Sequence, residues 1–302
     1  MNSSCVFPIA FVLAAISATA QAGTPINETR AVDARAQIAI NNVRGSITVT
    51  TWDRDEVGIS GTLGTGSKEL LIEGGSSRLS IEVKGPVESG WFNWGANSRM
   101  EDTLLDVKVP REAELEIEVV SANVAVSGSA GRSIDADSVS GRIRIESTAR
   151  ELEIGSVSGS IELIGSADRV QADTVSGEIN VRTQAKRLSF ETVSGRINVE
   201  TDRYEEISAS SVSGDISVRG DPAGNSARLS SETMSGSVRV RLPGNVSARI
   251  EAETFSGRIR TDFGTVKEPE YGPGRSLSTT VGSGDSRIDI ETFSGDVDIR
   301  KE

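Results

Sequence analysis

A short motif, Val-Ser-Gly or a close variant, recurs eight times along the chain and constrains the fold more than any other feature. The residues before Ser-Gly are Val139, Val157, Val175, Val193, Val212, Met234, Phe255 and Phe293. Successive copies lie 18 or 19 residues apart at first, and then 22, 21 and 38 residues apart. A degenerate copy, VVSANVAV, precedes them at 119–126. Such a period predicts one supersecondary unit that is stacked many times.

Apolar residues alternate with polar ones on both sides of each Ser-Gly. In the copy at Val193 they are Leu188 and Phe190 before the motif, and Ile197 and Val199 after it. A spacing of two is typical of half-buried strands. The apolar positions are even before the motif and odd after it. We therefore expect the chain to bend or bulge between Phe190 and Val193, with Val193 in the core.

The repeat length favours a solenoid. Propeller blades usually take about 40–45 residues, more than twice the step seen here. In a parallel β-solenoid, equivalent residues stack about 4.8 Å apart, so one buried ladder would contain Ile143, Ile161, Ile179, Ile197 and Ile216. We predict an all-β, single-stranded parallel β-solenoid with coils of about 18–22 residues, right-handed like most parallel crossovers. A meander of β-hairpins or a propeller-like array is the alternative.

The chain is expected to have three parts. Residues 1–22 resemble a secretory signal peptide, because an apolar run from Val6 to Ile16 precedes the small residues Ala20-Gln21-Ala22. We therefore predict an exported protein, periplasmic or extracellular. Residues 23–110 are predicted to form an irregular β region that caps the stack, and 111–302 the solenoid, with a long loop at 264–286. The charged C-terminal sequence DVDIRKE is expected to end the stack.

Composition excludes several kinds of chemistry. The chain has no histidine, and its one cysteine, Cys5, lies in the predicted signal peptide. His-based acid–base catalysis, thiol chemistry and zinc binding through His or Cys are therefore not expected. The net charge of −12 disfavours nucleic acid and anionic lipid surfaces. We predict no cofactor, no metal, no nucleic-acid partner and no membrane insertion.

Carboxylates are the remaining chemical groups of interest. Six copies carry an acid two positions before the residue that precedes Ser-Gly: Asp137, Asp173, Glu191, Glu232, Glu253 and Glu291. Such a row could bind calcium or supply a glycosidase pair. We interpret it instead as a solvated strand face, partly balanced by Arg142, Arg196 and Arg258 across the turn. The repeated serine has no base beside it in the motif and is interpreted as a turn residue.

Three stretches of the sequence resemble one known family. They are the TVSGxIxV-like copies, GSITVTTWDRDEV at 45–57, and LLDVKVPREAELEIEVVSANV at 104–124. Together they resemble the DUF4097 family of exported bacterial β-strand repeat proteins, which are described as adhesin-like. The resemblance implies an all-β repeat domain at the bacterial cell envelope, and it supplies no catalytic residues.

We therefore expect a non-catalytic exported scaffold that presents loops for binding or adhesion, with an envelope protein or a glycan as partner. The candidate binding residues are the aromatic side chains Trp91, Phe92, Trp94 and Tyr271, in the segments 85–102 and 264–286 that interrupt the repeat. End-to-end self-association is a further possible role. The alternative function is a polysaccharide-acting enzyme of the parallel β-helix type that uses paired carboxylates.

Overall fold

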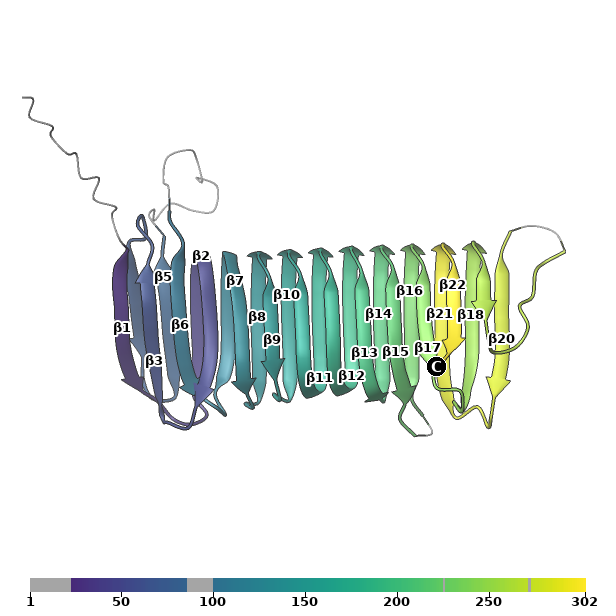
Figure 1. Ribbon diagram of the computed structural model, residues 1–302, viewed down its shortest axis with the longest axis horizontal. Helices are drawn as coiled ribbons and strands as arrows, with labels where there is room; N and C mark the ends of the chain where they lie inside the picture. The colour runs from purple at the N-terminus through teal and green to yellow at the C-terminus, as the bar shows by residue number, and fades with distance from the viewer. Residues whose placement is uncertain (1–22, 86–99, 225, 271–272) are drawn as a thin grey trace, which may run out of the picture.

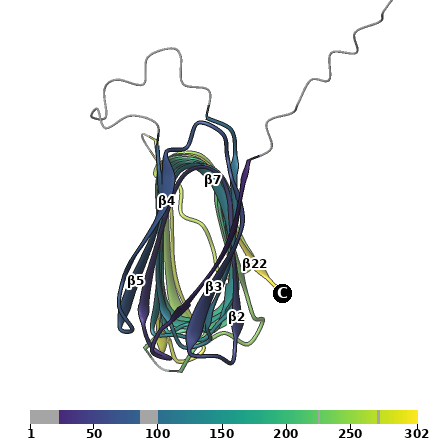
Figure 2. The same ribbon diagram turned by 90° about the vertical axis from the view of Figure 1, so that its left-hand side faces the viewer.

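The computed structural model describes residues 23–85, 100–224, 226–270 and 273–302, and all the regular elements in these ranges are β-strands. The 22 strands form one long stack with two opposed faces (Figures 1 and 2). Within the same ranges, no helix has the length and hydropathy needed to cross a membrane.

The strands that precede the Ser-Gly corners make up the first face. From the N-terminal end it contains β4 (Glu69–Gly74), β5 (Arg78–Lys84), the first halves of β2 (Gln37–Trp52) and β7 (Glu114–Ser129), β8 (Ser133–Ser140), β10 (Glu151–Ser158), the second halves of β11 (Ile161–Ser176) and β12 (Ile179–Ser194), β14 (Glu206–Ser213), β16 (Arg228–Ser235), β21 (Ser286–Ser294), β18 (Ala248–Ser256) and β20 (Arg275–Val281).

The strands that follow the corners make up the second face. In the same direction it contains β1 (Thr24–Ala31), β3 (Glu56–Leu63), β6 (Thr103–Pro110), the second halves of β2 and β7, β9 (Ile143–Ser147), the first halves of β11 and β12, β13 (Ile197–Tyr204), β15 (Ile216–Pro222), β17 (Val238–Leu242), β22 (Val297–Lys301) and β19 (Ile259–Thr261).

Successive coils pair in parallel and in register, which confirms the predicted β-solenoid over the meander and the propeller. The isoleucine ladder runs from Ile143 through Ile161, Ile179 and Ile197 to Ile216, with each residue the backbone partner of the next. All five side chains are fully buried. Ordered stacking of branched apolar side chains between the two faces therefore forms the core.

The position of the predicted bend was wrong. Strand β12 continues unbroken from Phe190 through Thr192 to Ser194. Thr192 is buried, whereas the side chain of Val193 is 49% exposed. The inward-facing positions of β12 thus continue one step beyond Phe190, its last inward apolar residue. The small hydroxyl side chain of Thr192 occupies that final inward position. The change of parity falls in the corner between Ser194 and Ile197, and Val193 lies on the surface.

The Ser-Gly corners bring the backbones of successive coils very close together. A Cβ atom added to Gly195 would lie 1.7 Å from the carbonyl oxygen of Gly177, and one added to Gly214 would lie 1.7 Å from that of Gly195. No side chain fits in such a space, so the corner requires glycine because of this close approach. The predicted role of Ser-Gly as a structural corner is therefore supported by a direct steric reason.

The coils do not stack in chain order at the C-terminal end. Strand β21 lies between β16 and β18, and β22 lies between β17 and β19 (Figure 1, yellow strands within the green). The expectation that the C-terminal sequence ends the stack is wrong, because Val297 and Ile299 are fully buried inside it. The edge is covered instead by β20, which pairs antiparallel with β18 and lies within the segment 264–286.

The N-terminal end is arranged in a similar way. Strand β2 lies between β7 on one side and the β5 and β6 strands on the other (Figure 1). Beyond them, β4 pairs antiparallel with β5, β3 with β6, and β1 with β3. Antiparallel strands therefore cover both faces at this end, and the first face at the other end, where open edges would otherwise invite further pairing.

Candidate binding groove

A groove of about 1550 Å³ follows the Ser-Gly corners along the outer side of the first face. Each repeat contributes the same three positions to it, which in β12 are Glu191, Thr192 and Val193. Residues of β2 and β5 line one end, and the other is lined by Lys267 and by Arg275, the first residue of β20. The groove therefore extends along most of the stack.

The apolar side chains along this groove form a continuous line, here called the apolar ladder. In spatial order it consists of Val139, Val157, Val175, Val193, Val212, Met234, Phe293 and Phe255. Each is between 39% and 62% exposed. The rings of Phe293 and Phe255 stack, with centroids 4.8 Å apart and planes within 7° of parallel.

This alignment sets the apolar ladder apart from scattered surface residues. Among the described residues, Leu104 is the only other large hydrophobic side chain that is exposed. Single exposed apolar residues are ordinary, but contiguous apolar surface marks sites of interaction. The apolar ladder is therefore the best candidate for a binding surface in the described part of the chain.

The six predicted acids form a second line beside the apolar ladder, here called the acid row. Backbone pairing brings Glu232 next to Glu291, and Glu291 next to Glu253. Gly155 and Ser210 occupy the equivalent positions in the two coils that lack an acid. Because acid and apolar residues are two positions apart on the same strand, both point outward into the groove.

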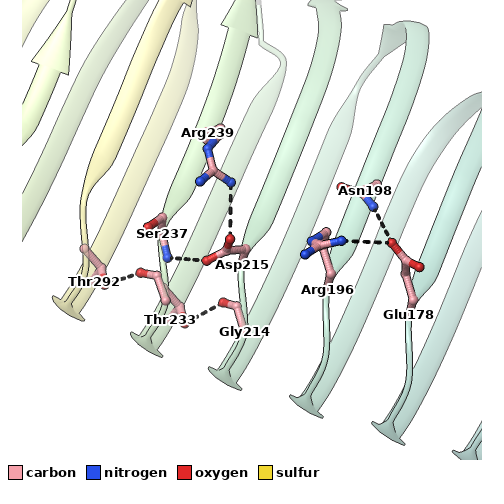
Figure 3. Close-up of polar contacts among 10 residues, drawn as sticks. Glu178, Arg196, Asn198, Gly214, Asp215, Thr233, Ser237, Arg239 and Thr292 are labelled. Atoms are coloured by element: carbon pink, nitrogen blue, oxygen red, sulfur yellow. Dashed lines mark hydrogen bonds and ion pairs between the residues drawn. The ribbon is translucent and has the colours of Figure 1, made fainter.

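The acid row is not balanced by the arginines predicted to balance it. Arg196 pairs with Glu178 at 3.5 Å, on the far side of the corner, as Figure 3 shows. Arg258 pairs with Asp296 at 3.1 Å in the same way. Within the described ranges, no acid of the row has an ion-pair partner. The groove thus presents uncompensated negative charge beside an apolar line.

The hydroxyl side chains between the two lines are structural. Thr233 donates a hydrogen bond to the Gly214 carbonyl at 3.3 Å, and Thr292 donates one to the Gly236 carbonyl at 3.2 Å (Figure 3). Thr254 makes the equivalent bond, 3.0 Å long, to Gly295. These three hydroxyls are buried and tie their corners to the neighbouring coil. At the equivalent position of the other five coils, the hydroxyls are buried without a hydrogen-bond partner: Ser138, Ser156, Thr174, Thr192 and Ser211. None is positioned as a nucleophile.

A second group of acids lies on the first face near the N-terminal part of the groove. Asp135 has Glu116 as its backbone partner on one side and Glu153 on the other. The pKa of Asp135 is raised to about 6, mainly because its carboxyl group is partly buried and also because nearby carboxylates repel its negative charge. The contributing residues are Asp137, Glu153, Glu116 and Glu118. Among the described residues, no cluster of acids is arranged to hold a metal ion.

The raised pKa of Asp135 predicts a pH-dependent effect of Asp135→Asn. The folded state holds this proton up to about pH 6, whereas an unfolded Asp releases it near pH 4. The protonated carboxyl of Asp135 therefore stabilises the fold fully below about pH 4, and this stabilisation is lost as the pH rises through about 6 and the carboxyl ionises in the folded state. In urea titrations, Asp135→Asn should raise the free energy of unfolding at about pH 7.5, and the gain should vanish near pH 4.

Glu206→Gln is the matched control. Glu206 lies on the same face, but its backbone partners are Arg187 and Arg228 instead of acids. Neutralising it should not stabilise the protein at neutral pH. An equal gain from both variants would mean that net charge, and not the environment of Asp135, causes the effect.

The candidate residues predicted from the sequence are not tested by these observations. Trp91, Phe92, Trp94 and Tyr271 lie outside the described residues, so their role in binding stays a prediction. The acid row was found from the sequence. The apolar ladder was missed as a surface, because its residues were assigned to the core. The Ser or Thr that precedes every ladder residue was the available signal, since it is the side chain that points inward.

The fold and the groove together define an all-β parallel solenoid protein with one long surface groove. The family model for Toastrack DUF4097 matches residues 36–300. The chain belongs to the DUF4097 family, as the three sequence stretches predicted.

Three solved structures share the fold. A putative adhesin from Parabacteroides merdae is 10% identical, with a TM-score of 0.51 over 92% of this chain and 96% of that one. A putative adhesin from Parabacteroides distasonis is 12% identical, with a TM-score of 0.51 over 93% and 98%. A putative lipid binding protein from Parabacteroides distasonis is 14% identical, with a TM-score of 0.50 over 93% and 97%. At these identities the likeness concerns the fold alone. No curated protein matches the sequence.

Proposed function

We propose that the protein is a non-catalytic, exported scaffold that binds a partner along its groove at the bacterial cell envelope. The observation that carries the proposal is the apolar ladder, whose eight exposed side chains lie in one line on rigidly stacked coils. Keeping such a line in contact with water is unfavourable. A bound partner that covers the apolar ladder removes this unfavourable contact with water.

The arrangement of the acids favours binding over catalysis. A glycosidase pair attacks the scissile bond from two sides. The acid row instead occupies one position of the repeat and therefore lies along one wall of the groove. The chain also has no histidine, and the buried hydroxyls of Thr233, Thr254 and Thr292 donate to backbone carbonyls. The polysaccharide-acting enzyme thus has less support than the scaffold.

The similar structures are consistent with a binding role. Two are named as putative adhesins and one as a putative lipid binding protein. We carry over from them the general role of binding, with an envelope protein or glycan as the partner. The aromatic residues Trp91, Phe92, Trp94 and Tyr271 remain candidates for additional contacts in the interrupting segments.

Co-sedimentation of the purified chain with isolated cell envelopes tests the binding role. The triple variant Val175→Ser, Val193→Ser and Val212→Ser removes three exposed ladder side chains, and it should keep the fold by circular dichroism while binding about tenfold less. Leu104→Ser, at an exposed apolar residue outside the groove, should bind like the unchanged protein. Equal retention of the triple variant and the unchanged protein would overturn the proposal.

Export is tested separately with a fusion of residues 1–22 to alkaline phosphatase, which is active only outside the cytoplasm. The fusion should be active, and deletion of the apolar run from Val6 to Ile16 should abolish the activity. An inactive full fusion would contradict export through this segment.

A further inference from the structure

We propose that the occupant of the groove is an extended polypeptide segment in which basic side chains are interspersed with apolar ones. This inference rests on the proposed function, because it names the chemistry of the partner that the groove binds. Three features of the groove favour this occupant: its charge, its length and the position of its aromatic pair.

The charge of the groove selects a cationic partner. The acids are most dense toward the C-terminal end, where Glu232, Glu291 and Glu253 occupy three consecutive coils. Covering these exposed carboxylates with a neutral partner would remove their water without replacing it, which is costly. Lysine and arginine side chains replace that water with charge-assisted hydrogen bonds.

The basic residues at that end do not neutralise the acids. Among the described residues lining the groove, the cations are Lys267 and Arg275. The guanidinium of Arg275 donates to Glu268 at 2.7 Å and also to the carbonyl of Gly257. Arg275 is therefore engaged within its own segment. With Glu268 also lining the groove, this end remains acidic.

The apolar ladder adds a second requirement for the ligand. Each acid lies two residues from a ladder side chain on the same strand, as Glu291 does from Phe293. A ligand must therefore present positive and apolar groups side by side. The stacked rings of Phe293 and Phe255 also offer a π-face beside two carboxylates, where a guanidinium is favourable.

The length of the groove requires an extended chain. Eight ladder residues at a coil spacing of about 4.8 Å span roughly 34 Å. An extended peptide of about ten residues covers that distance at about 3.3 Å per residue. An anionic phospholipid is disfavoured because its headgroup would be repelled by the acid row. A neutral glycan offers no cation to the carboxylates.

Fluorescence anisotropy with a labelled synthetic peptide of repeated Arg-Val-Ser units tests the proposal. The unchanged protein should bind it, with an affinity that falls as salt is added. The triple variant Glu232→Gln, Glu291→Gln and Glu253→Gln should bind about tenfold less, as should Phe293→Ser. Peptides of Glu-Val-Ser or Arg-Ser-Ser units should not bind, because each lacks one of the two chemistries.

The matched control removes the same charge elsewhere. Glu146, Glu205 and Glu206 are exposed and lie outside the groove, so changing all three to Gln should leave binding unchanged. An equal loss in both triple variants, or equally tight binding of the Arg-Ser-Ser peptide, would overturn the proposal by showing that general surface charge is responsible. Binding of anionic phospholipid vesicles in place of the Arg-Val-Ser peptide would overturn it in favour of a lipid.

The envelope experiment separates this inference from the proposed function. If envelope binding depends on the apolar ladder but no Arg-Val-Ser binding occurs, the groove is a binding site and the cationic peptide is the wrong occupant. If the ladder variant keeps envelope binding, the proposed function fails as well. Circular dichroism of every variant excludes misfolding as the cause of a loss.

Discussion

Replacing Gly195 with alanine is expected to lower the free energy of unfolding by about 3 kcal/mol or more. The added Cβ would lie 1.7 Å from the carbonyl oxygen and 2.8 Å from the carbonyl carbon of Gly177. Both are backbone atoms of a corner whose flanking strands pair in register, so relief requires the two coils to move apart and weaken their hydrogen bonds. Urea unfolding followed by circular dichroism measures the loss.

Gly244→Ala provides the control. A Cβ added there would meet no atom within 4 Å, and the residue lies in the turn between β17 and β18. Its substitution should change the stability by no more than about 0.5 kcal/mol. If the two variants cost the same, the close approach of the corner backbones would not be what requires glycine at the Ser-Gly motif.

The second large effect is expected from Ile290→Asp, which should lower the free energy of unfolding by about 4 kcal/mol or more. Ile290 belongs to the last coil in the sequence, yet it is 1% exposed and has Ser231 and Ala252 as backbone partners on its two sides. A carboxylate at this position would be buried without a partner. Thermal and urea unfolding measure the loss.

Ser294→Asp adds the same charge to an exposed position of the same strand and should cost about 0.5 kcal/mol or less. A terminal coil that frays would tolerate either substitution. Comparable small effects at both positions would therefore contradict the internal location of β21.

The stacked core was predictable because its signal is periodic. The ladder from Ile143 to Ile216 follows directly from a repeat of nearly constant length, since a parallel stack places equivalent residues side by side. The Ser-Gly corner was predictable for a related reason. Glycine in every copy indicates a backbone constraint that every coil shares.

The groove was harder to predict because hydrophobicity alone misplaces its residues. Val193 resembles a core residue, whereas Thr192 resembles a surface residue, and the structure places them the other way round. The corner leaves room inside for only a small side chain, and in the coils of Thr233, Thr254 and Thr292 its hydroxyl also donates to a neighbouring backbone carbonyl. A valine at that position would lack this bond.

The order of the coils could not be read from the pattern. Strands β16, β18 and β21 carry the same inward spacing of apolar and hydroxyl residues. Each is therefore compatible with either of the others as a neighbour. The step of 38 residues between Phe255 and Phe293 indicated an interruption, but periodicity alone does not show that the chain returns through it to an inner position.

The internal position of the last coil separates the order of assembly from the order of synthesis. A chain that emerges from its N-terminus completes β18 and β19 before β21 and β22 exist. The inward patterns of β16, β18 and β21 match, so the native order requires that the space between β16 and β18 is open when β21 is inserted. Insertion of β21 is also the step that places Phe293 beside Phe255 in the groove.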